Sequence, residues 1–252
     1  MRANKLRDIW AAGGTAVNGW LHIPSSWSAE VMAHAGWDSV TVDLQHGLSG
    51  YQVAVTMLQA IATTDAVPMA RATWNDTAQL MRLLDAGAYG IICPMINSRA
   101  EAEAFVGACR YPPLGYRSFG PTRARVYAGA DYAQYANETI VTLAMVETQQ
   151  ALDNLEGILS TPGLDGVFVG PNDLRLSLTG KTEMDLSDPI LQTALEQIVN
   201  VTRENGRVAG IWVPDAATGQ QMSQLGYQLI TVSTDTRLLT AAAQNIVTKF
   251  KL

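Results

Sequence analysis

The chain has 252 residues, of which 48% are hydrophobic and 16% are charged, and its formal net charge is −6. This composition supplies a large core and excludes long disorder, and an acidic balance without a basic patch argues against a nucleic-acid partner. The length fits one α/β barrel, so we predict a single domain over residues 1–252.

Short apolar segments rich in β-branched residues alternate with longer helical patterns along the whole chain. Nearly continuous hydrophobicity within these segments is typical of parallel strands that are covered on both faces. The pattern predicts strands at 16–22, 38–43, 66–71, 89–95, 139–146, 165–169, 207–213 and 228–233.

Helix signals lie between the predicted strands. Ser49 with Gln52 and Ser98 with Glu101 are spaced as capping boxes. Glycines follow four of the helical patterns, where a left-handed cap is favoured, at Gly36, Gly87, Gly206 and Gly226. Eight β–α alternations predict a closed (β/α)8 barrel, the TIM barrel. The alternative is an open doubly wound sheet, but residues 23–26 after the first strand are not a glycine-rich phosphate loop.

Two segments stand apart from this alternation. Residues 110–138 show no clear strand, and loops of this length are commonly functional or packed on a partner. The last helical pattern, about 236–250, either closes the bottom of its own barrel or docks on a neighbouring subunit.

Export and membrane signals are absent from the sequence. No apolar stretch approaches 18 residues, and no apolar signal core follows residues 1–8. The two cysteines, Cys93 and Cys109, do not form a disulfide framework. We therefore predict a reduced, cytoplasmic protein with no membrane partner.

In a (β/α)8 barrel the active site lies at the carboxyl ends of the strands. Polar and aromatic residues at those predicted positions are Trp20, His22, Asp43, His46, Arg71, Glu147, Asn172, Asp173, Trp212 and Asp215. Trp20 and Trp212 either line a substrate pocket or belong to the core.

Glu147 and Asp173 follow adjacent predicted strands, so both can face one point. Two carboxylates at an apolar barrel mouth repel each other unless a cation or proton lies between them. Oxygen ligands favour a hard divalent ion, Mg²⁺ or Mn²⁺. The alternative is that each acid caps the helix that follows it.

His46 is a candidate general base, and Asp43, three residues earlier, is placed to orient its ring. The alternative for His46 is a bond to a backbone carbonyl, and His22 is a weaker candidate. Arg71 ends a core strand, where a permanent cation needs an anion, either the substrate or a strand-end acid.

Asp85 ends a helix that runs away from the active-site face of its own barrel, so it can assist catalysis only in a neighbouring subunit, and Arg82 is its simpler partner. None of the four lysines ends a predicted core strand, at Lys5, Lys181, Lys249 and Lys251. This disfavours Schiff-base chemistry and leaves metal activation as the route to an enolate.

Over almost its whole length the chain resembles the HpcH/HpaI family of hydroxy-ketoacid aldolases. The residues that carry the resemblance are Gly19-Trp20-Leu21, Asp43-x-x-His46, Arg71, Pro94-Met95, 115–118 (Gly-Tyr-Arg-Ser), 146–148 (Val-Glu-Thr) and 166–174 (Gly-Val-Phe-Val-Gly-Pro-Asn-Asp-Leu).

The resemblance implies a metal-dependent (class II) pyruvate aldolase with a phosphoenolpyruvate/pyruvate-type barrel, which cleaves a 4-hydroxy-2-oxo acid to pyruvate and an aldehyde in aromatic or sugar acid catabolism. It implies that Glu147 and Asp173 bind Mg²⁺, Mn²⁺ or Co²⁺. It implies that His46 is the base, supported by Asp43 and by Asp85 of an adjacent subunit, and that Arg71 stabilises the enolate.

The resemblance also implies that backbone at Asn172 and Asp173 holds the pyruvate carboxylate, and that the terminal helix is swapped between subunits of a hexamer, a trimer of dimers. Two positions depart from the family pattern. Gln45 stands where a glutamate is common, and Met145 stands where a glutamine contacts substrate. Two alternatives stay open: a citrate-lyase-type enzyme acting on a CoA thioester, and a non-catalytic binding barrel.

Overall fold

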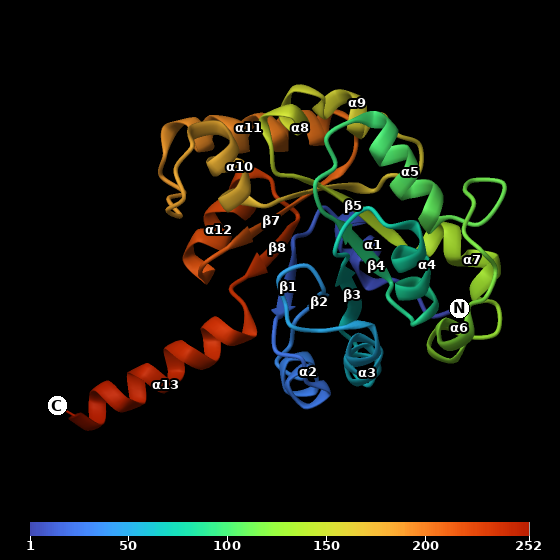
Figure 1. Cartoon of the computed structure of the whole chain (residues 1–252), viewed down its shortest axis with the longest axis horizontal. Helices are drawn as coiled ribbons and strands as arrows, with labels where there is room; N and C mark the ends of the chain where they lie inside the picture. Colours follow the sequence, from blue (N-terminus) through green and yellow to red (C-terminus); the bar gives the residue numbers. More distant parts are fainter. Residues whose placement is uncertain (252) are drawn as a thin grey trace.

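The computed structural model describes residues 1–251. Across this range eight strands form one closed barrel in which each strand runs parallel to both neighbours. The strands are β1 (Ala16–Leu21), β2 (Ser39–Asp43), β3 (Val67–Arg71), β4 (Gly90–Cys93), β5 (Val141–Val146), β6 (Gly166–Val169), β7 (Val208–Val213) and β8 (Leu229–Val232). Each lies within one of the predicted segments, so the predicted (β/α)8 barrel is confirmed (Figure 1).

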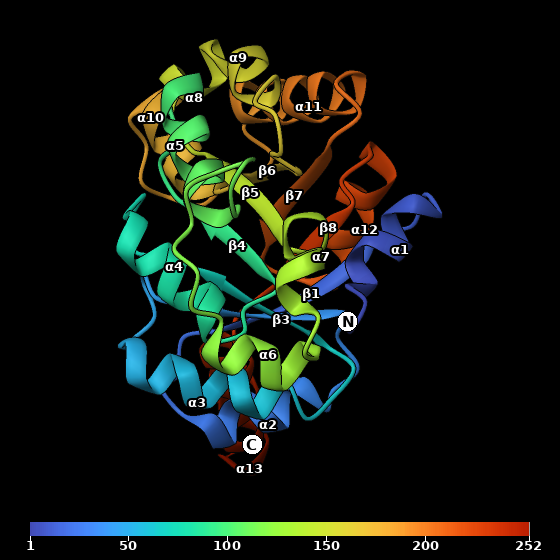
Figure 2. The same ribbon diagram turned by 90° about the vertical axis from the view of Figure 1, so that its right-hand side faces the viewer.

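Helices surround the barrel on its outer side (Figures 1 and 2). They are α1 (Lys5–Ala11), α2 (Ser26–Ala33), α3 (Tyr51–Ile61), α4 (Thr77–Asp85), α5 (Arg99–Cys109), α6 (Thr122–Ala128), α7 (Tyr132–Thr139), α8 (Gln149–Asp153), α9 (Leu155–Leu159), α10 (Pro171–Thr179), α11 (Pro189–Glu204), α12 (Ala216–Leu225) and α13 (Asp235–Lys251). None of those within residues 1–251 is long and apolar enough to cross a lipid bilayer.

The helix ends confirm most of the predicted signals. Ser98 caps α5, because its hydroxyl accepts a hydrogen bond from the backbone N–H of Glu101 at 3.3 Å. The capping box at Ser49 is wrong, since α3 starts after Gly50 and the Ser49 hydroxyl donates to the sulfur of Met57. The four glycines predicted to follow helices all have positive φ, at Gly36, Gly87, Gly206 and Gly226.

The segment 110–138 contains no strand, as predicted, but it folds into α6 and most of α7. Arg117 anchors this segment from the inside, where it is buried between the rings of Tyr111 and Tyr132. Its guanidinium also lies 2.7 Å from the Asp85 carboxylate at the end of α4. Asp85 therefore pairs with Arg117 and not with Arg82, the partner that the sequence suggested.

The barrel interior beneath the site is closed by polar side chains that satisfy one another. The Asn18 side chain donates to the hydroxyl of Thr231 at 2.8 Å and accepts from Ser39 and Thr41. All four side chains are buried. Buried polar groups cost little when each has a partner, so this layer forms a rigid floor under the carboxyl ends of the strands.

Candidate active site

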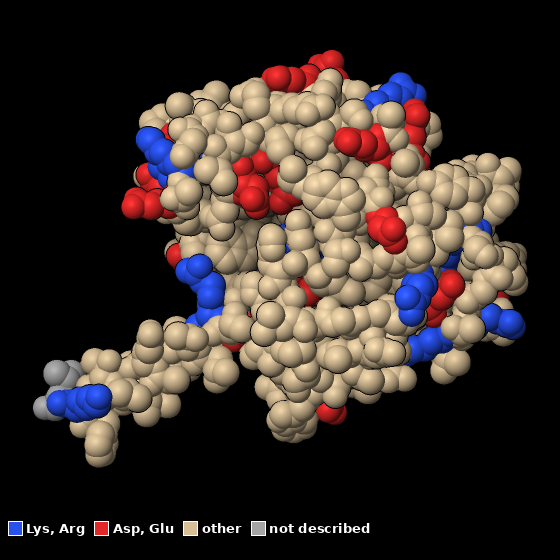
Figure 3. Space-filling model, in the orientation of Figure 1, with Lys and Arg blue, Asp and Glu red and all other residues tan. Residues whose placement is uncertain are grey.

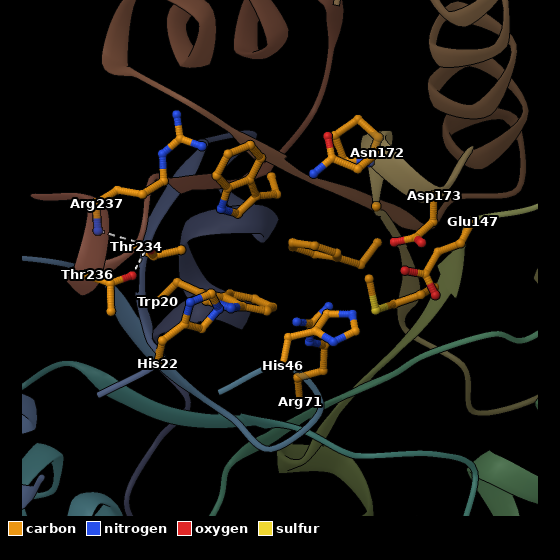
Figure 4. Close-up of a pocket in the computed structure, with 15 residues that line it drawn as sticks. Trp20, His22, His46, Arg71, Glu147, Asn172, Asp173, Thr234, Thr236 and Arg237 are labelled. Atoms are coloured by element: carbon orange, nitrogen blue, oxygen red, sulfur yellow. Dashed lines mark hydrogen bonds between the residues drawn. The ribbon is translucent and has the colours of Figure 1, made fainter. Parts of the chain in front are cut away.

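A cavity of about 250 Å³ lies at the carboxyl ends of the strands, where a (β/α)8 barrel places its active site (Figure 4). Figure 3 shows acidic side chains in the middle of this face and basic side chains where α13 leaves the barrel. The lining residues are Trp20, His22, His46, Arg71, Met145, Glu147, Phe168, Gly170, Pro171, Asn172, Asp173, Trp212, Thr234, Thr236 and Arg237.

Asp43 and Arg71 form a bidentate ion pair at the edge of the cavity. They are direct partners in the register of β2 and β3, so their side chains leave the barrel side by side. The Arg71 Nε lies 2.8 Å from Asp43 Oδ1 and its Nη2 lies 2.5 Å from Oδ2. Arg71 lines the cavity, and this pair holds its guanidinium in place.

The carboxylate of Asp43 is fully buried. Two further side chains contact it, one from β1 and one from the loop that follows β1. His22 Nε2 and Trp20 Nε1 lie 2.9 and 3.1 Å from Oδ2. Burial opposes ionisation of Asp43, but hydrogen bonds from His22 and Arg71 and the charge of Arg71 outweigh it. Together they hold the pKa of Asp43 well below its ordinary value.

The predicted contact between Asp43 and the His46 ring is wrong. Asp43 accepts from the backbone N–H groups of Gln45 and His46, at 2.9 and 3.3 Å, and the imidazole beside its carboxylate belongs to His22. His46 itself is exposed and lines the cavity. Asp43 thus shapes the loop that carries His46 without touching its ring nitrogens.

Glu147 and Asp173 lie together on the opposite side of the cavity, with their carboxylates adjacent (Figure 4). Glu147 follows β5 and is 2% exposed, whereas Asp173 is exposed in the first turn of α10. Burial raises the pKa of Glu147 to about 7, and the neighbouring charge of Asp173 adds to that effect.

Two features of the backbone fix the position of the Glu147 carboxylate. The N–H of Met95 donates to Glu147 Oε2 at 2.9 Å, and Met95 has a left-handed φ of 55°, which is uncommon outside glycine. Gly170 leaves room for the other oxygen, because a Cβ built there would lie 2.5 Å from Glu147 Oε1. The chain therefore holds the buried carboxylate of Glu147 against the exposed carboxylate of Asp173.

This arrangement fits a hard divalent cation. Within residues 1–251 no group of three or more His, Cys, Asp or Glu side chains is arranged to hold a metal ion. Mg²⁺, however, is commonly bound through one or two carboxylates plus water and substrate. The alternative that Glu147 caps the next helix is wrong, because Thr148 caps α8 and accepts from the N–H of Ala151.

Apolar and aromatic side chains form the base of the cavity between the two polar sides. Trp20 stacks on Phe168 with ring centroids 5.6 Å apart, and Met145 is buried beside them. Trp212 is partly buried, and its Nε1 donates to the carbonyl of Ser233 at 3.2 Å. Both tryptophans line the cavity, so they are not simply core residues.

Most of the predicted site residues are brought together here. Those that line the cavity are Trp20, His46, Arg71, Met145, Glu147, Asn172, Asp173 and Trp212. Asp43 lies behind Arg71, and Asp85 lies outside this cavity on α4. Three further residues follow the end of β8 and also line the cavity, although none of them was predicted from the sequence: Thr234, Thr236 and Arg237. The rule that active-site residues follow strand ends applies to them as well.

Comparison with known proteins shows which family this chain resembles. Residues 19–242 match the family model for HpcH/HpaI aldolase/citrate lyase. The chain is 39% identical to a hydroxypyruvate/pyruvate aldolase of Rhizorhabdus wittichii, with 97% of each chain covered. It is 36% identical to a 4-hydroxy-2-oxo-heptane-1,7-dioate aldolase of Escherichia coli, covering 98% of this chain and 95% of that one. A crystal structure of an HpcH/HpaI aldolase/citrate lyase family protein from Burkholderia cenocepacia superposes with a TM-score of 0.89 at 31% identity, with 98% of each chain covered.

Proposed function

The chain belongs to the HpcH/HpaI aldolase/citrate lyase family and is a carbon–carbon lyase, and from this premise we propose a metal-dependent pyruvate aldolase. In this proposal it cleaves a 4-hydroxy-2-oxo acid reversibly to pyruvate and an aldehyde. The observation that carries the proposal is the Glu147–Asp173 carboxylate pair facing Arg71 across one cavity. A cation and a fixed guanidinium on two sides of a keto acid are what an enolate requires.

Glu147 and Asp173 are the residues that would hold Mg²⁺, Mn²⁺ or Co²⁺. Their oxygen atoms suit a hard ion, and the raised pKa of Glu147 reflects burial of a negative charge that a cation would offset. When bound, the ion supplies positive charge that stabilises an enolate oxygen.

The other residues bind the keto acid and move its proton. Backbone N–H groups at Asn172 and Asp173, in the first turn of α10, would hold the pyruvate carboxylate at the positive end of the helix. His46 takes the proton of the C4 hydroxyl. The C3–C4 bond then breaks, its electron pair forms the pyruvate enolate, and the aldehyde leaves. Arg71 stabilises the charge of the enolate, whose protonation at C3 gives pyruvate.

The assembly that we propose is a homo-oligomer in which α13 packs on a neighbouring copy. In the isolated chain only Asp235 of this helix is buried. Apolar side chains along α13 are exposed, namely Leu238, Leu239, Ile246, Val247 and Phe250. A free apolar helix face of this kind favours association. The hexamer implied by the family resemblance, with Asp85 reaching a neighbouring site, is part of this proposal.

The test is release of pyruvate from a panel of free 4-hydroxy-2-oxo acids, with and without EDTA. We expect turnover that EDTA abolishes and that added Mg²⁺ or Mn²⁺ restores. In a parallel arm, Arg71→Lys should lower kcat by about 100-fold, because lysine keeps the charge but not the fixed planar fork. Calorimetry should show unchanged Mn²⁺ affinity in that variant. Turnover that needs a CoA thioester, or that survives EDTA, would contradict the proposal.

A further inference from the structure

The cavity has two polar ends of opposite character (Figure 4). Glu147 and Asp173 lie at one end, where the proposed function places the keto acid. At the other end Figure 4 shows His22, Thr234, Thr236 and Arg237, with the aromatic side chains between the two groups. A substrate that extends from the two carboxylates across the aromatic base of the cavity therefore reaches the hydroxyl groups of Thr234 and Thr236 and the guanidinium of Arg237.

Arg237 is held over this far end by an aromatic contact. It belongs to the first turn of α13, and its guanidinium carbon lies 5.4 Å from the centroid of the Trp212 ring. The indole is itself fixed by the hydrogen bond from Trp212 Nε1 to the Ser233 carbonyl. Stacking of arginine on an aromatic ring leaves its N–H groups directed outward in the guanidinium plane, where they can still donate.

Within residues 1–251 the Arg237 side chain makes no salt bridge, and its guanidinium donates no hydrogen bond. The nearest acid in sequence, Asp235, is buried and already engaged. Its two carboxylate oxygens accept from the backbone N–H groups of His22 at 2.8 Å and Ile23 at 3.1 Å. The cation that lines this end of the cavity is thus not neutralised by the acid next to it.

We propose that Arg237 is a specificity-determining residue, which binds an anionic group at the far end of the substrate and so selects aldehydes that carry a carboxylate. The inference rests on the proposed aldolase function and deepens it by naming the substrate class. An uncharged aldehyde would leave the N–H groups of the guanidinium with only water as a hydrogen-bond acceptor. A carboxylate would meet a preplaced donor pair, a geometry that arginine favours.

The reaction itself shows where that anion lies. In a 4-hydroxy-2-oxo diacid the C4 hydroxyl loses its proton, the C3–C4 electron pair passes to the enolate, and C3 is then protonated. From 4-hydroxy-2-oxoheptanedioate this yields pyruvate and succinic semialdehyde. The second carboxylate belongs to the aldehyde fragment, at the opposite end from the keto acid, so it extends toward Arg237 when the keto acid lies at Glu147 and Asp173.

The experiment compares cleavage of two acids of equal chain length, 4-hydroxy-2-oxoheptanedioate and 4-hydroxy-2-oxoheptanoate, which lacks the terminal carboxylate. The protein should prefer the diacid in kcat/KM. Arg237→Gln should raise KM for the diacid by about tenfold with little change in kcat, and it should leave the other acid unaffected. Arg237→Lys should recover part of the loss, since it restores the charge.

Arg203→Gln is the matched control, because it removes the same charge from α11 outside the cavity. This variant should leave kcat/KM unchanged for both acids. Equal kcat/KM for the two acids in the unmodified protein would overturn the proposal. So would a loss in Arg237→Gln that is the same for both acids, since that result indicates a structural role.

A binding measurement separates this inference from the proposed function. 4-Hydroxybutyrate is the unreactive alcohol of succinic semialdehyde, and its binding to EDTA-treated protein is measured by calorimetry against 1-butanol. Arg237→Gln should weaken 4-hydroxybutyrate binding by about fivefold or more. Unchanged binding would overturn the role of Arg237 even if the enzyme is active. No pyruvate release with intact Arg237-dependent binding would sink the aldolase mechanism alone.

Discussion

At the scale of single residues, Asp43 joins three neighbouring strand ends through one carboxylate. It accepts hydrogen bonds from Trp20, from Arg71 and from the backbone of the loop that carries His46, and it contacts the ring of His22. Because both of its oxygens are used, the carboxylate stays ionised in the folded protein. Arg71 can therefore face the cavity in a fixed orientation, although its charge is already paired.

A first prediction concerns stability in acid. The folded state lowers the pKa of Asp43, so the stabilisation is fully present above the unfolded value of about 3.9 and is lost as the pH falls below it. Asp43→Asn removes this dependence. It also leaves Arg71 buried without its partner, at a cost of about 3–5 kcal/mol.

Urea midpoints measured between pH 5 and pH 2 test this prediction. The unmodified protein should lose stability more steeply toward low pH than Asp43→Asn, which starts lower but declines less. Parallel slopes for the two proteins would show that Asp43 does not titrate differently in the folded and unfolded states.

At the scale of elements, the segments that follow β4, β5 and β6 jointly position one carboxylate. The segment after β4 supplies the N–H of Met95, β5 leads into Glu147, and Gly170 joins β6 to α10. Adjacent parallel strands end at the same edge, which places all three within contact distance. The position of the Glu147 carboxylate therefore depends on a residue without a side chain at position 170.

The second prediction is that Gly170→Ala weakens metal binding without unfolding the protein. The added methyl group would lie 2.5 Å from Glu147 Oε1, so the carboxylate must shift from its present position beside Asp173. Mn²⁺ affinity, measured by titration calorimetry, should fall about tenfold or more, as for other changes behind a metal ligand. Gly50→Ala is the control, because no atom lies within 4 Å of its added Cβ. Equal Mn²⁺ affinity in both variants would argue against this placement of the ion.

At the scale of the whole molecule, α13 is the element that the barrel leaves uncovered. It extends away from the strands on one side of the molecule (Figure 1). Its first turn is tied to the barrel through Asp235, and Arg237 in the same turn lines the cavity. Packing of the distal turns on another copy would therefore also fix the end of the helix that carries the proposed anion site.

The third prediction is that Ile246→Glu dissociates the protein into smaller species. Ile246 is 68% exposed in the single chain, and a charge there would be buried without a partner when α13 packs on a neighbour. Gln244→Glu adds the same charge on the opposite side of the helix and should leave the assembly intact. Light scattering coupled to size-exclusion chromatography measures both. An unchanged mass for Ile246→Glu would mean that α13 is not part of an interface.

The sequence by itself determined the barrel and the main polar groups at its mouth. Strand periodicity and the glycines after helices are local properties, so the positions of all eight strands could be predicted. Parallel strands of a barrel end at the same edge. The predicted strands therefore also predicted that Arg71, Glu147 and Asp173 lie at one site.

Only the tertiary structure decided which of these groups contact one another. Asp43 and His46 are close in sequence, but the ring beside the Asp43 carboxylate is that of His22, because β1 and β2 are neighbours in the barrel. Likewise, Arg117 reaches Asp85 from a segment 32 residues away. Side-chain direction depends on register and on long-range packing, which local sequence patterns do not contain. For the same reason, the position of Arg237 over Trp212 depends on the pairing of β7 with β8, which the sequence pattern does not specify.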